Sequence, residues 1–294
     1  MTTAVVLTNL ILGAVYTSYG IMTIFDLKRG WKHFGFSHFG MAWIAMAFTC
    51  GPHHLEHAFH LASASRGGLF HVVSTIGMVC RPISAVSPAH FALTFGRGNG
   101  PGSGGPLDLA VVLVGFPAGV IWFLLRVEAL RGGRGDRFVS GTPKWVAALP
   151  VLSAVYLVAA TIAAIGILVR SGAAFGPRYT PNILLLVVYC LIGYYLLRTQ
   201  LANREPMGGW SVSGLALTVV FPTCGVMHAV FVVFAASGRY DVGTLGLVID
   251  WLAVPAAIYF VWVVRSLYHG TVDDWNQATT GATTDVSAAP ALVA

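Results

Sequence analysis

The sequence predicts an all-α, polytopic membrane protein: a bundle of about eight transmembrane helices with a duplicated three-helix unit. Apolar residues make up 56% of the 294 residues and charged residues only 10%, against about 25% charged in an ordinary soluble domain. The apolar residues gather in segments long enough to cross a bilayer. A six-residue pattern that occurs once in each half of the chain predicts the duplication.

The N-terminal half is predicted to contain four helices, over residues 4–25, 36–62, 69–95 and 107–125. The turn between the first two carries the basic residues Lys28, Arg29 and Lys32. Residues 96–106 form a glycine-rich linker, which lacks the lysine of a phosphate-binding loop. We expect residues 1–95 to form the first three-helix unit, unit A.

The C-terminal half is predicted to contain four more helices, over residues 145–169, 182–197, 210–236 and 245–264. Residues 107–170 then form a two-helix connector, residues 181–268 form unit B, and residues 269–294 form a polar, disordered tail. With two helices between the units, unit B is expected to be inverted relative to unit A.

Charge and composition indicate the surroundings of the protein. The net charge of +6 lies in loops and helix ends, and the positive-inside rule explains it more simply than a nucleic-acid partner. We expect a multi-pass protein of a bacterial cell membrane, with the lipid bilayer as its main partner.

The helix predicted over residues 36–62 carries a dense polar cluster in its second half. Cys50, His54 and His57 share one helical stripe, while His53, Glu56, His57 and His60 share the adjacent stripe. Polar groups are costly in hydrocarbon unless something satisfies them. Soft sulfur and nitrogen donors suit Cu(I), whereas nitrogen and oxygen donors suit zinc, iron or manganese. We therefore expect these six residues to bind a metal ion.

The pattern T-C-G-x-x-H occurs twice, at Thr49–His54 and at Thr223–His228. Both copies lie inside a long apolar segment, follow a segment that ends in basic residues, and precede a third apolar segment. Each cysteine has a histidine about one turn further along the helix. Cys224 and His228 are therefore expected to be metal ligands as well, in one site shared by both copies or in two.

The order of apolar helix, basic turn, helix with CGxxH, short turn and third helix resembles the ethylene-binding domain of ethylene receptors. The resemblance covers residues 15–93 and, more faintly, residues 181–265. It implies Cu(I) held within the membrane by Cys50 with His54 and by Cys224 with His228, and a small apolar ligand bound to the copper. The chain departs from the family in the extra histidines of the first copy, in Asp250 where the third helix usually has a lysine, and in having no segment that resembles a histidine kinase.

Two further polar residues fall inside the predicted helix 69–95. His71 follows the short turn after His60 and is expected to complete a metal site from the facing helix. Arg81 needs a carboxylate, carbonyl groups or water, and Glu56 or Asp250 is its expected intramembrane partner.

Several functions fit these residues. The one we expect is a copper-binding membrane protein with a receptor-like or copper-handling role. One alternative is a zinc or iron metalloenzyme, because His53-x-x-Glu56-His57 matches the H-x-x-E-H pattern in which the glutamate is the catalytic base. A second alternative is a haem b electron carrier, with His54 or His57 opposite His228 as axial ligands. The histidines can also line a polar cavity or bond to neighbouring helices without binding a metal.

Overall fold

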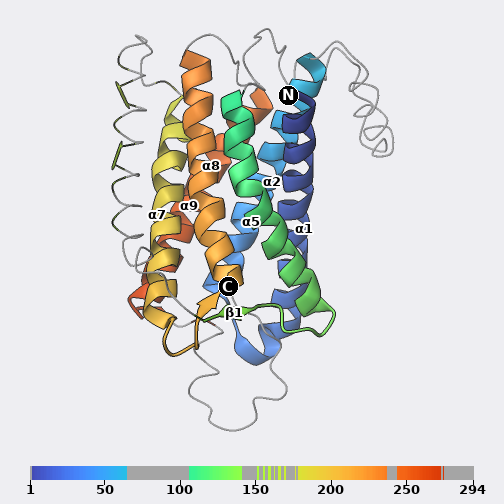
Figure 1. The fold of residues 1–294 in the computed structure, drawn as a ribbon, viewed down its shortest axis with the longest axis vertical. Coiled ribbons are helices and arrows are strands. Elements are labelled where there is room, and N and C mark those ends of the chain that lie inside the picture. The colour runs from blue at the N-terminus through green and yellow to red at the C-terminus, as the bar shows by residue number, and fades with distance from the viewer. Residues whose placement is uncertain are drawn as a thin grey trace.

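The computed structural model describes residues 2–64, 106–140, 176, 178–236, 244–272 and 274, together with single positions between 151 and 169. Within these residues it is all-helical, as predicted, apart from one short strand pair (Figure 1). The helices are α1 (Thr2–Phe34), α2 (His38–Ala64), α5 (Pro106–Leu130), α7 (Thr180–Asn203), α8 (Val212–Ala236) and α9 (Thr244–Tyr268). The strands β1 (Phe138–Val139) and β2 (Trp210–Ser211) pair antiparallel just before α8 begins.

Five of these helices, all except α2, are long and apolar enough to cross a membrane. Large apolar side chains are exposed on their outer faces, among them Leu7, Ile11, Val114, Leu124, Leu252 and Ile258. Such surfaces suit lipid better than water. The polar cluster lowers the hydropathy of α2, which packs between α1 and α9. These helices indicate a multi-pass integral membrane protein, and the predicted total of eight stays a prediction because residues 65–105 and most of 141–175 lie outside the described part.

The helices pack in a closed ring in the order α1, α2, α9, α7, α8 and α5, and α5 returns to α1. A half-turn about the bundle axis therefore exchanges α1 with α7, α2 with α8, and α5 with α9. Helices α1 and α7 run in the same direction, and so do α2 and α8 (Figure 1). This parallel arrangement is also known for repeats in membrane proteins. The expected inversion of unit B is wrong for these helix pairs.

The inversion was expected because α5 was assigned to a connector that follows a third helix of unit A. In the structure α2 ends and α5 begins at the same end of the bundle (Figure 1), and α5 lies where the half-turn places the partner of α9. Both helices contain an internal Pro-Ala pair, at Pro117 and at Pro255. The predicted helix 69–95 lies outside the described residues, so the boundaries of the two units stay predictions.

The first helix is longer than predicted and continues to Phe34. No proline interrupts residues 26–34, and the helix ends at Gly35, whose φ of 72° is the left-handed conformation typical of a helix C-terminus. The basic residues predicted to form a turn, Lys28, Arg29 and Lys32, therefore lie on the last turns of α1.

The glycine of each TCGxxH copy allows two helices to approach closely. A methyl group at Gly51 would overlap the side chain of Thr17 and lie 3.2 Å from the carbonyl oxygen of Gly13, both on α1. A methyl group at Gly225 would lie 3.1 Å from the carbonyl oxygen of Leu186 on α7. Small residues at such contacts are typical of packed membrane helices. They bring the polar residues of α2 and α8 close to α1 and α7.

Candidate metal centre

The two TCGxxH copies meet at one cavity between α2 and α8. The residues that line it include both cysteines and both histidines of the pattern, together with His53, Met227 and Tyr189. The side chains of Cys224, His54 and His228 are buried, and Cys50 is partly buried. The ligand pairs that the sequence left as one site or two therefore face a single cavity.

An asparagine holds each of the two histidines. Nδ1 of His54 lies 2.7 Å from Oδ1 of Asn9, and Nδ1 of His228 lies 2.6 Å from Oδ1 of Asn182. The amide nitrogen of Asn9 donates to a carbonyl of its own helix, and that of Asn182 donates to Asp250 over 2.7 Å. Both amides therefore present an acceptor to the ring, so each histidine donates its Nδ1–H and keeps the lone pair of Nε2. Metal-ligating histidines are usually held in this way.

Each cysteine lies near a tyrosine from the other half of the bundle. The sulfur of Cys50 lies 3.1 Å from the hydroxyl of Tyr189 on α7, and Tyr16 on α1 lines an adjoining cavity together with Cys224. Each tyrosine also packs against the histidine of its own half, with ring centroids 5.4 Å apart in both halves. The half-turn that exchanges α1–α2 with α7–α8 thus also relates the contacts around the cavity.

These paired contacts are what a duplication of the α1–α2 pair in α7–α8 would produce. The third cysteine of the described part, Cys190, does not line the cavity, and its sulfur packs near Gly225 at the α7–α8 contact. The duplicated three-helix unit itself stays a prediction, because the helix expected to complete unit A lies outside the described residues.

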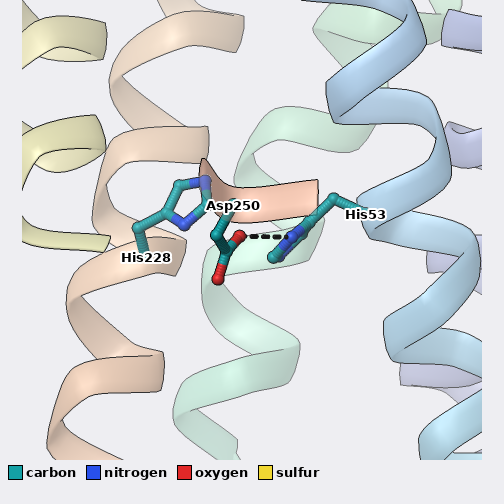
Figure 2. Close-up of side chains that lie close together, drawn as sticks. All are labelled: His53, His228 and Asp250. Atoms are coloured by element: carbon teal, nitrogen blue, oxygen red, sulfur yellow. Dashed lines mark ion pairs between the residues drawn. The ribbon is translucent and has the colours of Figure 1, made fainter. Parts of the chain in front are cut away.

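A second group of donors adjoins the cavity (Figure 2). Nδ1 of His53 on α2 lies 3.0 Å from Oδ1 of Asp250 on α9, and the Asp250 carboxylate lies between the rings of His53 and His228. One donor atom from each of these three residues lies within 4.8 Å of the other two. All three side chains are buried. The cluster could therefore hold a metal ion.

The other polar residues of the first copy lie outside this cluster. Glu56 is buried against Gly246 of α9. The rings of His53 and His57 both pack on Phe231, with centroids 5.3 and 4.6 Å from it. A zinc hydrolase of the H-x-x-E-H type needs both imidazoles on one ion, whereas here His53 is joined to His228 and Asp250 instead.

Three predicted residues cannot be placed. The side chain of His60 and the whole of His71 and Arg81 lie outside the described residues. The predicted metal-binding roles of the two histidines and the predicted ion pair of Arg81 stay predictions. Asp250, one expected partner of Arg81, contacts His53 and Asn182.

Sequence reasoning missed Asn9, Asn182 and Met227. A signal for the asparagines was present: each is an uncharged polar residue near the start of the apolar helix that precedes a TCGxxH copy. Met227 gave no signal, because a methionine in a membrane helix is ordinarily an apolar packing residue. Its place in the cavity depends on α8 lying opposite α2 in the ring.

The predicted resemblance to the ethylene-binding domain depends on the two CGxxH segments and their helical context. The chemistry of the centre follows from the donors that line the cavity. Comparison of the chain with protein-family models, with curated proteins and with solved structures finds no match.

Proposed function

We propose that this membrane protein binds one Cu(I) ion in the cavity between α2 and α8. Cys50, Cys224, His54 and His228 are the ligands, and the role is receptor-like or copper-handling. The observation that carries the proposal is the convergence of both thiols and both imidazoles on one cavity. Each imidazole is held through Nδ1 by an asparagine, which leaves Nε2 as the ligand atom.

The sulfur donors favour Cu(I) over a harder ion. Two cysteines and two histidines also make a zinc set, so the choice depends on the rest of the lining. Met227 adds a thioether, a ligand that Cu(I) accepts and for which zinc has little use. Met227 lies at the position of α8 that corresponds to His53 of α2, so the α8 half supplies a thioether where the α2 half has an imidazole that faces Asp250.

The size of the cavity favours an ion over a haem. It has room for about one water-sized particle between the side chains that line it. A haem with two axial histidines would require α2 and α8 to separate widely, whereas the rings of His53 and His228 are 4.8 Å apart between their centroids. A Soret band in purified protein would contradict this argument.

Metal content and copper affinity test the proposal. The full chain is purified in detergent and titrated anaerobically with Cu(I) against a chromophoric chelator. We expect one copper per chain, a loss of affinity in Cys50→Ser and in Cys224→Ser that exceeds the roughly 10- to 100-fold typical for a lost hydrogen-bond partner of a ligand, and loss of stoichiometric binding in the double variant.

Cys190→Ser is the matched control, because it removes a buried thiol that does not line the cavity. It should bind copper like the unchanged protein. Full copper retention in the double variant, or zinc at one per chain in place of copper, would contradict the proposal.

A further inference from the structure

We propose that His53, Asp250 and Glu56 form a second cation site, for a first-row divalent ion with nitrogen and oxygen ligands, of the class of Mn²⁺, Fe²⁺ and Zn²⁺. It lies beside the cavity that contains the cysteines and uses no sulfur ligand. The site does not depend on copper binding and is tested separately from it.

Glu56 provides the observation that points to a cation. Its side chain is only 2% exposed, and neither carboxylate oxygen has a hydrogen-bond partner among the described residues. On α2 it lies one turn from His53, and on the facing helix Gly246 lies one turn from Asp250. A methyl group at Gly246 would be 3.3 Å from both oxygens of Glu56. Both carboxylates thus lie at the α2–α9 contact, where an unsatisfied charge costs several kcal/mol.

The donor residues one turn from Glu56 on α2 and one turn from Gly246 on α9 suit a divalent ion. Neither ring nitrogen of His53 has a hydrogen-bond partner in the described part of the chain, so the neutral ring can offer a lone pair to an ion. Asp250 is held by the amide of Asn182 over 2.7 Å through one oxygen, and its other oxygen faces His53. Two carboxylates match the charge of a divalent cation, and carboxylate with imidazole is the ligand set of manganese, iron and zinc.

The other half of the bundle shows that the fold does not require these polar residues. In the second TCGxxH copy, Met227 and Val230 stand in place of His53 and Glu56. On α5, Val112 stands as far before Pro117 as Asp250 stands before Pro255 on α9. All three counterparts are buried. Apolar side chains therefore fill the corresponding places, and the polar set on α2 and α9 needs a reason other than packing.

Mn²⁺ is the probe for this site, because it prefers oxygen and nitrogen ligands and binds poorly to thiols. Its binding to the full chain in detergent is followed by the loss of the free-ion electron paramagnetic resonance signal. We expect one Mn²⁺ per chain, with the same affinity in the Cys50→Ser/Cys224→Ser double variant. Glu56→Gln and Asp250→Asn should each weaken binding at least tenfold, while Glu205→Gln, which changes an exposed carboxylate, should not.

Gly246→Ala tests the geometry without removing a ligand. Its methyl group would press on the Glu56 carboxylate, so Mn²⁺ affinity should fall severalfold while the melting temperature stays close to that of the unchanged protein. No Mn²⁺ binding to the unchanged protein, or unaltered binding in both Glu56→Gln and Asp250→Asn, would overturn the proposal. Failure of the copper site would show only in the copper titration.

Discussion

Asn182 connects the two groups of donors in this protein: its amide oxygen accepts from Nδ1 of His228 over 2.6 Å, and its amide nitrogen donates to Asp250. The ring that faces the cysteines and the carboxylate that faces His53 are therefore oriented by one side chain. In the other half of the bundle Asn9 orients only His54, since its amide nitrogen bonds to its own helix.

Replacement of Asn182 by leucine, which has a similar volume, should weaken copper binding 10- to 100-fold. The ligand His228 remains, but the hydrogen bond that fixes its tautomer and ring orientation is lost. The affinity is measured by the chelator titration described above.

Asn9→Leu should have a similar effect on copper through His54, and this comparison separates the two roles of Asn182. Only Asn182→Leu should also weaken Mn²⁺ binding, because only Asn182 contacts Asp250. Thr199→Val, on α7 and away from the cavity, is the control. Copper affinity equal to that of the unchanged protein in both asparagine variants would contradict the role of these hydrogen bonds in orienting the histidine ligands.

The tyrosine hydroxyl at Cys50 is expected to make a small contribution to copper binding. Tyr189→Phe removes the hydroxyl that lies 3.1 Å from the Cys50 sulfur. A hydrogen bond of this kind is worth about 1 kcal/mol, so the variant should weaken copper binding by about fivefold or less in the chelator titration. Tyr16→Phe, which changes the tyrosine that lines the adjoining cavity with Cys224, is the comparison, and tighter copper binding in Tyr189→Phe would contradict the prediction.

The main candidate donors of the centre could be predicted from the sequence. Cys50, His54, Cys224 and His228 stand out in sequence because polar groups in an apolar helix need a partner. The repeated pattern left one site or two open, and their convergence on one cavity depends on how α2 and α8 face each other. The hydrogen bond between Tyr189 and Cys50 could not be predicted, since it joins residues of different halves and depends on which helices are neighbours in the ring. The direction of unit B was wrong for a similar reason, because it depended on counting helices through residues 65–105 without knowing which end of the bundle α5 starts from.

Asp26 of α1 and Arg126 of α5 form a buried ion pair. We expect that removal of one partner destabilises the bundle far more than removal of both. Arg126→Met alone leaves a buried carboxylate and should lower the free energy of unfolding by about 3–5 kcal/mol. The double variant Asp26→Leu/Arg126→Met should recover most of this loss, because it removes both charges. Unfolding in detergent followed by circular dichroism measures the cycle, and additive losses would contradict a direct pair.

Asp136, in the loop after α5, is hydrogen-bonded to residues at the start of α8. Its carboxylate accepts from Ser211 Oγ at 2.6 Å and from Ser213 at 3.0 Å (backbone N) and 2.8 Å (Oγ). Asp136→Ala should lower the free energy of unfolding by about 2–3 kcal/mol, since hydrogen bonds to a charged group are among the stronger ones.

The neighbouring surface pair is the control for Asp136. Hydrogen bonds to Glu128 raise the pKa of Arg137, yet this pair is solvent-exposed, and Glu128→Gln should leave the stability unchanged within error. A stability loss of the same size in both variants would show that the loop charge, and not the contact with Ser211 and Ser213, is what matters.

The two TCGxxH glycines should differ in their tolerance of a methyl group. At Gly51 the methyl would overlap Thr17 and lie 3.0 Å from the Thr17 backbone nitrogen, whereas at Gly225 its nearest neighbour is a carbonyl oxygen at 3.1 Å, and Cys190 Sγ lies at 3.4 Å. Gly51→Ala should therefore cost about 1–3 kcal/mol of unfolding free energy and Gly225→Ala less. Gly166, a helical position with no atom within 4 Å of the added methyl, is the control, and alanine there should be neutral or stabilise by up to about 1 kcal/mol. A larger loss for Gly225→Ala than for Gly51→Ala would mean that α7 and α8 approach more closely than α1 and α2.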